Sequence, residues 1–313
     1  MIVDEAPEPT EAPSRAAEAL RLCRAGDEAA GLAVYRSLAR PRLIATLPIG
    51  LHAHLLEEAG CSAAAAELRR IGVRGGGDVA WRATLPGAAP EAAAAEYAAL
   101  FARGLANPFM VNRYLLALTA LGRTGEVAAI YDASRLLHCV KLSGAEEAAA
   151  ALLALEGQGE IGSRLSVRNM REIRSIHRTP AFADVMAACR AETAAYLARW
   201  AASDHPLARL VPEGFKIGAW GTISRGEGYN TRHTHPVAWA TGVYYPVDAP
   251  VEAEGGALEI GGWSDPAPPG WPRASIRPEA GLLVLIPSYY VHWTRPLGVP
   301  GLRMSIAFDA VPA

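Results

Sequence analysis

Three histidines near the C-terminus have the types and spacing that a metal site needs. His233 and His235 are separated by one residue, and His292 follows on a later segment. Because side chains alternate along a strand, the first two imidazoles would project from the same face of an extended segment. A third imidazole from a later strand could complete one facial set of ligands. We therefore predict that His233, His235 and His292, three of the chain's eight histidines, hold a metal ion.

The elements that must position these histidines are predicted from a change in composition. Residues 14–199 are rich in Ala, Leu, Glu and Arg, which favour helices. From about Phe215 onward, short runs of Gly, Pro, aromatic and β-branched residues indicate strands and turns. Short strands of this number and spacing suit a double-sheet jelly roll, which can hold a metal in its mouth. The strands are expected at residues 215–224, 229–235, 238–247, 257–261, 273–277, 282–286, 290–295 and 303–310.

We therefore predict an α+β fold in three parts. An N-terminal domain of α-helical hairpins spans residues 1–145. Connecting and buttressing helices span residues 146–204. A C-terminal jelly roll, or double-stranded β-helix, spans residues 205–313 and contains the three histidines.

The helical half shows a weak internal repeat. Gly26 and Gly60 lie 34 residues apart, which is the tetratricopeptide period. Tyr35 follows Gly26 by nine residues, and Tyr131 follows Gly122 by the same interval. The pattern resembles a degenerate tetratricopeptide array. Its register fails between Gly60 and Gly122, so an irregular, Ala-rich helical domain is the alternative.

Charge, cysteine usage and hydropathy limit the function classes. The net charge of −2 gives no basic field for nucleic acid. The four cysteines form no CxxC motif, which suits reduced thiols in the cytosol better than a disulfide framework. The N-terminus lacks the pattern of a signal peptide, and no apolar run approaches the roughly 20 residues of a membrane-spanning helix. We expect a soluble, cytoplasmic protein that binds neither nucleic acid nor a membrane.

A series of motifs follows in order along the C-terminal part of the chain. The motifs are His233-Thr234-His235-Pro236, Thr241-Gly242-Val243-Tyr244-Tyr245, Gly255-Gly256-Ala257-Leu258, Gly281 to Ser288, His292 and Arg303-Met304-Ser305. Their order resembles that of iron(II)/2-oxoglutarate-dependent oxygenases over roughly residues 215–310. More narrowly, it resembles a bacterial group with His-x-His-Pro, Ser-Gly-Val-Tyr-Tyr, Phe-Pro-Ser and a distal histidine. Thr241 and Ile286 depart mildly from the Ser and Phe that are usual at these positions of the bacterial group.

The resemblance implies an enzyme that uses iron(II) and 2-oxoglutarate to hydroxylate a peptide, protein or small-molecule substrate, with succinate and CO₂ as co-products. His233 resembles the first iron ligand and His292 the distal ligand of a facial set. Arg303 would bind the distal carboxylate of 2-oxoglutarate bidentately, and Ser305 on the same strand face would add a hydrogen bond. Tyr245 matches a position that in related enzymes often donates to the same carboxylate.

His235 departs from the common pattern, because most relatives carry Asp or Glu two residues after the first histidine. The third ligand is therefore either His235 itself or a carboxylate such as Glu259 or Asp265, with His235 behind it. Three neutral ligands would leave the iron site one unit more positive than the usual triad. Asn230 either hydrogen-bonds the cosubstrate or a ligand histidine, or is a turn residue after Gly228.

Two other functions fit part of the pattern. One is a cupin-type metal dioxygenase with three histidines that needs no 2-oxo acid. The other is a non-catalytic adaptor, in which helical repeats accompany a jelly roll whose histidines are merely hydrogen-bonded. Neither needs Arg303 and Ser305 at their spacing, so this pair favours the oxygenase. In that enzyme, the helical half could recruit a peptide or protein substrate.

Overall fold

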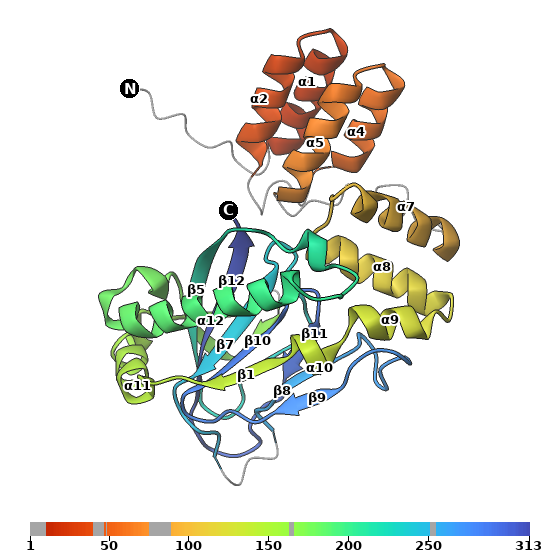
Figure 1. The fold of residues 1–313 in the computed structure, drawn as a ribbon. Coiled ribbons are helices and arrows are strands. Elements are labelled where there is room, and N and C mark those ends of the chain that lie inside the picture. The colour runs from red at the N-terminus through yellow and green to blue at the C-terminus, as the bar shows by residue number, and fades with distance from the viewer. Residues whose placement is uncertain (1–10, 40–46, 48, 75–88, 163–165, 251–254) are drawn as a thin grey trace, which may run out of the picture. The chain divides into compact units, whose positions relative to one another are not determined.

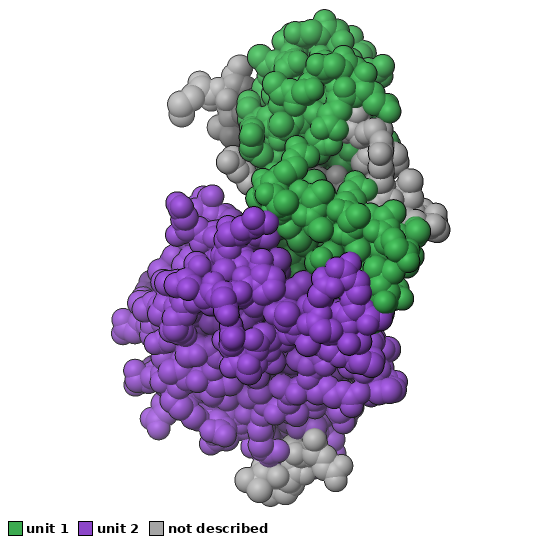
Figure 2. Space-filling model, turned by 45° about the vertical axis from the view of Figure 1, so that its right-hand side comes forward, with its two compact units in different colours: residues 1–121 green, residues 122–313 purple. Residues whose placement is uncertain are grey.

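The computed structural model describes residues 11–39, 47, 49–74, 89–162, 166–250 and 255–313 (Figure 1). The chain divides into two compact units, residues 1–121 and 122–313 (Figure 2). The division lies nearer the N-terminus than the boundary that the sequence predicts at residue 145. Within the described ranges, no helix has the length and apolar character that crossing a bilayer requires.

The first unit is built from helical hairpins. In each hairpin, two consecutive helices pack against each other around a turn that contains a glycine with positive φ. Gly26, Gly60 and Gly104 occupy these turns at φ values of +95°, +81° and +75°, a region that glycine adopts without steric cost. The hairpins are α1 (Ala12–Arg24) with α2 (Glu28–Leu38), α4 (Ile49–Glu58) with α5 (Ser62–Arg74), and α7 (Pro90–Ala102) with α8 (Pro108–Ala120).

The glycines that suggested a repeat in the sequence coincide only in part with the glycines at the hairpin turns. Gly26 and Gly60 have equivalent places, but the third hairpin turns at Gly104, which the sequence reading passed over. Gly122 follows α8 instead. The loss of register falls in part on residues 75–88, which lie outside the described residues. The hairpins are present, and their relation to tetratricopeptide repeats stays a prediction.

The second unit contains an antiparallel double-sheet domain of the jelly-roll kind. Its main sheet has the strand order β1-β10-β7-β12-β5-β4-β2, and the second sheet has the order β11-β8-β9. A short pair, β3 with β6, lies beside them. The strands are β1 (His138–Lys141), β2 (Glu160–Gly162), β3 (Val167–Arg168), β4 (Met170–Ile173), β5 (Phe215–Ser224), β6 (Tyr229–Asn230), β7 (Ala240–Tyr245), β8 (Leu258–Gly261), β9 (Ala274–Ile276), β10 (Leu282–Pro287), β11 (Val291–Thr294) and β12 (Arg303–Pro312).

All the predicted strands are present, but two features differ from the expectation. The strand expected at 229–235 ends at Asn230, and His233 forms only an isolated bridge with His292. In addition, β1 to β4 lie in the part that was expected to be helical. These short segments pair with β10, with β5, with one another or with β6. Their backbone hydrogen bonds to distant strands outweigh the helix-favouring local composition.

Helices cover one face of the main sheet. α12 (Ala183–Ala201) contacts β7 and β10 and crosses the sheet in Figure 1. Near its end, Trp200 stacks on Trp239 with ring centroids 5.8 Å apart. Burial of these rings against the sheet fixes β7 and β10, which line the site described next. The remaining helices of the unit are α9 (Thr124–Ile130), α10 (Ala133–Leu136) and α11 (Ala145–Ala154).

Candidate functional site

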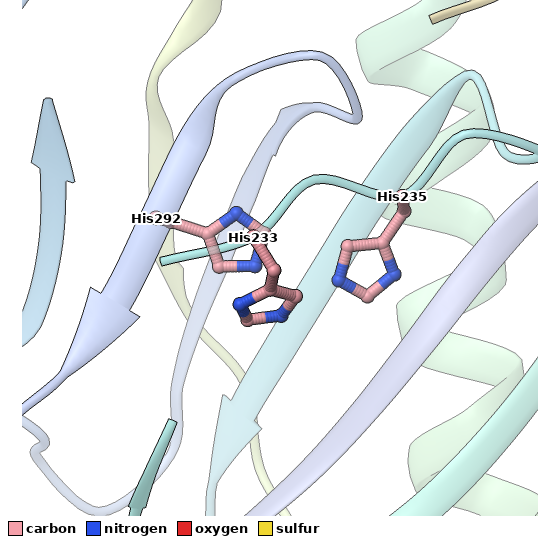
Figure 3. A group of neighbouring side chains, drawn as sticks. All are labelled: His233, His235 and His292. Carbon is pink, nitrogen blue, oxygen red and sulfur yellow. The ribbon is translucent and has the colours of Figure 1, made fainter. Parts of the chain in front are cut away.

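Three imidazole rings converge in the second unit (Figure 3). The ring centroids of His233 and His292 are 4.2 Å apart, and that of His235 lies 5.1 Å from each of them. One nitrogen from each ring can be chosen so that all three lie within 4.8 Å of one another. Three imidazole nitrogens at such distances can share one metal ion.

Backbone pairing brings the rings together although no regular strand carries the first two. The N–H groups of His233 and His292 each donate to the other residue's carbonyl oxygen at 3.1 Å. The N–H of His235 donates to the carbonyl of Ser288 at 2.9 Å. From His233 to His235 the segment therefore runs hydrogen-bonded alongside its neighbours, although it bends at Arg232 after β6 ends, and the two rings reach the same group.

Two of the rings are oriented by the same local contact. Nδ1–H of His233 donates to the carbonyl of Thr231 at 2.8 Å, and Nδ1–H of His292 donates to the carbonyl of Tyr290 at 2.9 Å. A carbonyl oxygen can only accept, so the proton resides on Nδ1 and Nε2 presents its lone pair.

The third ring is oriented by a carboxylate. Nδ1 of His235 lies 2.7 Å from Oδ1 of Asp309 on β12. Nε2 of His235 is buried and has no hydrogen-bond partner. All three rings thus have Nδ1 engaged, and a buried polar atom without a partner marks the place where a ligand is expected.

Burial also sets the charge of the rings. It lowers the pKa of His233 to about 4, and the neighbouring His235 contributes to this shift. Burial, with His233 and His235 as further causes, lowers the pKa of His292 well below its usual value. His233 and His292 are therefore neutral at pH 7, which is the form that binds a metal.

The carboxylates suggested as alternative ligands lie elsewhere. Glu259 accepts a hydrogen bond from Ser275 and lies 3.7 Å from Arg295, and Asp265 is 82% exposed. Among the residues that the structure describes, the only group of convergent ligand atoms consists of the three histidines. The alternative with Glu259 or Asp265 is therefore not supported by the geometry.

Asp309 is the residue near the site that the sequence reading missed. It lies on β12 with Arg303 and Ser305, and all three occupy odd-numbered positions of one strand. Side chains of a strand alternate between its faces, so the three share a face. The alternation of side chains along β12 is therefore a signal in the sequence that places Asp309 on the face of Arg303 and Ser305.

The cavity also holds a buried cation. Arg303 is only 4% exposed, and its Nη1 lies 3.4 Å from Oγ1 of Thr294 and 4.0 Å from Sδ of Met170. Its Nε has no hydrogen-bond partner, and no carboxylate among the described residues forms an ion pair with it. A buried guanidinium without an anion is costly, so the arrangement favours an anionic ligand.

The remaining predicted residues surround Arg303. The Tyr245 hydroxyl is buried without a hydrogen-bond partner; burial raises its pKa, and the adjacent Arg303 opposes that rise. Oγ of Ser305 lies 2.6 Å from Oγ1 of Thr222 on the next strand. The backbone N–H of Asn230 donates to Oγ1 of Thr294 at 2.8 Å. One cavity is lined by all seven residues of the predicted site: Asn230, His233, His235, Tyr245, His292, Arg303 and Ser305.

Comparison with protein families gives a match over the region that carries this cavity. Residues 218–309 match the family described as "Putative 2OG-Fe(II) oxygenase", where 2OG is 2-oxoglutarate. The matched region contains every residue of the predicted site. No curated protein matches the chain.

Several solved structures are similar in fold. A prolyl-4-hydroxylase from Pseudomonas putida is 15% identical, with 60% of this chain and 99% of that chain covered and a TM-score of 0.44. A prolyl hydroxylase from Trichoplax adhaerens, in complex with a peptide fragment of hypoxia inducible factor, is 13% identical, with coverages of 61% and 92% and a TM-score of 0.43. HygX from Streptomyces hygroscopicus, with nickel and 2-oxoglutarate bound, is 14% identical, with coverages of 59% and 86% and a TM-score of 0.38.

Proposed function

We propose a residue-level assignment for the second unit, which by its family match is a 2-oxoglutarate- and iron(II)-dependent oxygenase. In this assignment, Nε2 atoms of His233, His235 and His292 bind iron(II), and Arg303 binds the distal carboxylate of 2-oxoglutarate. When bound, the metal and cosubstrate would supply a reaction in which dioxygen is the oxidant: one oxygen atom enters succinate as 2-oxoglutarate loses CO₂, and the other serves to oxidise an organic substrate. The residues of the chain bind and orient the metal and the cosubstrate.

The buried, unpaired Arg303 is the observation that carries the proposal. 2-Oxoglutarate has a carboxylate at one end and a 2-oxo acid, able to chelate a metal, at the other. The cavity offers a guanidinium and three imidazoles on the same lining. A guanidinium held in a dry site binds a carboxylate in a fixed bidentate geometry, which would leave the 2-oxo acid end facing the histidines.

Two hydroxyls would complete the carboxylate site. The Tyr245 hydroxyl, buried without a partner, is placed to donate to the same anion that Arg303 binds. Ser305 already exchanges a hydrogen bond with Thr222, so it would add a contact or hold Thr222 in place. Asn230 supports the site through its backbone contact with Thr294, the hydroxyl that Arg303 also approaches.

A groove beside the cavity is the proposed entry for the substrate. Three residues, Asn230, Trp293 and Thr294, line both the cavity and this groove. The guanidinium of Arg232 lies 3.9 Å from the centre of the Trp293 ring, and its Nε donates to the carbonyl of Gly262. The rest of the groove is lined by Tyr229, Thr231, Arg295 and Pro296.

The substrate class remains as broad as the sequence implies: a peptide, a protein or a small molecule. The aromatic and cationic lining of the groove is compatible with each of them. We propose a cytoplasmic location, which fits the four cysteines of the chain, all of which are free thiols.

Binding of 2-oxoglutarate in the presence of manganese(II), measured by calorimetry, tests the assignment. Arg303→Met should weaken binding by at least about 30-fold, since truncating one partner of a buried charged pair costs about 2 kcal/mol or more. Arg225→Met is the matched control, because Arg225 is exposed and already paired with Glu156. Unchanged affinity in the Arg303 variant would refute the proposed carboxylate site.

A further inference from the structure

We infer that Asp309 is a positioning residue that acts on the metal through His235 and supplies the negative charge that a three-histidine site lacks. This inference rests on the proposed function, since it takes His235 as an iron ligand. It concerns one contact, the 2.7 Å approach of Asp309 Oδ1 to His235 Nδ1.

Asp309 is held in place by its neighbours rather than by solvent. Its side chain is 17% exposed, and its Oδ1 accepts a hydrogen bond from Oγ1 of Thr241 at 3.0 Å. Thr241 is its direct partner in the β7/β12 register and lies 2.9 Å from Oγ of Ser288. The main-chain carbonyl of Ser288 receives the N–H of His235. The carboxylate and the imidazole are thus fixed by one hydrogen-bond network, which runs from β12 through β7 to Ser288 at the end of β10.

The three rings differ in what accepts their Nδ1 protons. His233 and His292 each donate to a neutral carbonyl, whereas His235 faces a carboxylate. A carboxylate behind an imidazole fixes its tautomer and makes the opposite nitrogen a stronger electron donor. The ring of His235 is also stacked on Trp220, at 5.9 Å and an angle of 16°, so its plane is set. Its orphaned Nε2 therefore points in a fixed direction, and Asp309 increases the electron density that this atom offers to a metal.

Charge gives this contact a consequence beyond geometry. Three neutral imidazoles leave the full double positive charge of iron(II) uncompensated by protein ligands. Asp309 places one negative charge a single imidazole away, at a largely buried position where screening by water is reduced. His235 and Asp309 together then compensate part of the metal charge, as a carboxylate ligand would, while the ligand atom itself is a nitrogen.

A purely structural role for Asp309 makes a different prediction, and a change of background separates the two. Cobalt(II) binding, measured by anaerobic calorimetry on the full chain, is compared in four forms: wild type, Asp309→Asn, His235→Asp, and the double variant. In the wild-type background, Asp309→Asn keeps the shape and an acceptor oxygen but removes the charge. We expect cobalt affinity to fall about 10- to 100-fold.

In the His235→Asp background, the expected effect of Asp309→Asn is much smaller. The imidazole through which Asp309 acts is then absent, and the carboxylate at position 235 supplies the negative charge itself. Cobalt affinity should therefore change less than about threefold when Asp309 is replaced by Asn in this background. If Asp309 merely stabilises the strands, its replacement lowers affinity to the same extent in both backgrounds, and the inference is overturned.

Two further comparisons keep the test decisive. Thr241→Val removes the other hydrogen bond to Asp309 without changing charge, and should have a small effect of the same sign in both backgrounds. If the double variant does not fold, Asp309→Asn alone decides the matter, because wild-type cobalt affinity in that variant overturns the inference.

The cobalt measurement is independent of turnover. A loss of cobalt affinity confined to the wild-type background, without succinate formation by the iron(II)-loaded wild-type protein, would keep the role of Asp309 and refute the proposed oxygenase assignment. Succinate formation together with an equal loss in both backgrounds would do the reverse.

Discussion

The two units bury the same types of polar side chain, but in the helical unit these side chains have a partner in the protein and in the jelly-roll unit they lack one. In the helical unit, Arg69 is 8% exposed and forms a two-point contact with Glu57, at 2.5 and 2.8 Å. In the jelly-roll unit, Arg303 is 4% exposed and has no carboxylate partner among the described residues. A paired buried cation stabilises a fold, whereas an unpaired one costs stability and is retained where a ligand supplies the anion.

The histidines repeat this contrast. His52 in the helical unit is buried, and its Nδ1 lies 2.8 Å from the hydroxyl of Tyr35, which ties α2 to α4. His235 in the jelly roll has one nitrogen on Asp309 and the other buried without a partner. Residue type and burial are thus shared by the two units, and completeness of pairing distinguishes a structural contact from a candidate site.

The largest expected effect is on the stability of the jelly-roll unit when a metal ion and 2-oxoglutarate are added. Manganese(II) and 2-oxoglutarate, each at about 100 times its dissociation constant, should each contribute up to about 2.7 kcal/mol to the stability of the unit that binds them. Hydrogen exchange followed by mass spectrometry should therefore slow in β7, β11 and β12 and stay unchanged in α1, α2, α4 and α5. Equal protection in both units would contradict binding of the two ligands at the jelly-roll site alone.

Removing each arginine should have effects of opposite sign on the ligand-free protein. Arg303→Met relieves an unpaired buried charge and should raise stability by about 1–3 kcal/mol. Arg69→Met removes the two-point contact with Glu57 and should lower stability by about 1–2 kcal/mol, a modest figure because Glu57 is partly exposed. Urea denaturation read by hydrogen exchange in each unit measures both changes. Destabilisation by Arg303→Met would mean that its guanidinium has a structural partner.

The features of this site that can be predicted from the sequence are those set by a few consecutive residues. The alternation of strand side chains predicts that His233 and His235 share a face, and that Arg303 and Ser305 do so on a later strand. The bounds expected for β5 are those found. These features depend on a few consecutive residues, and the structure brings them to one cavity.

The parts that the sequence reading did not predict depend on long-range pairing. β1 and β4 lie in a helix-favouring stretch and become strands because β10 and β5 offer open edges to them. The contact between Asp309 and His235 joins two segments whose proximity follows only from the sheet order. That Arg303 lacks a carboxylate depends on every neighbour at once, so no local pattern could predict it.

A pH titration of stability tests the buried histidine of the helical unit. Burial lowers the pKa of His52, so below pH 6.5 the unfolded state takes up a proton more readily than the folded state. Stability is therefore complete above pH 6.5 and falls as the pH drops toward the lowered folded value, by at most about 1.4 kcal/mol per pH unit. Hydrogen exchange in α2 and α4 should show this slope between pH 7 and pH 5.5. His52→Gln should flatten it, and an unchanged slope would assign it to another group.

Ser305→Ala should have the smallest effect, because its hydroxyl already has a partner in the protein. Loss of one neutral hydrogen bond is worth about 1 kcal/mol, so the dissociation constant of 2-oxoglutarate should rise about fivefold while manganese affinity stays unchanged. Thr222→Val, which removes the partner of that hydroxyl, is the matched control and should cost less if Ser305 contacts the cosubstrate directly. If Thr222→Val costs as much as Ser305→Ala, the two hydroxyls act as one unit and Ser305 serves to place Thr222. In either case the loss should stay well below that of Arg303→Met, because a neutral, paired hydroxyl carries far less binding energy than a buried, unpaired cation.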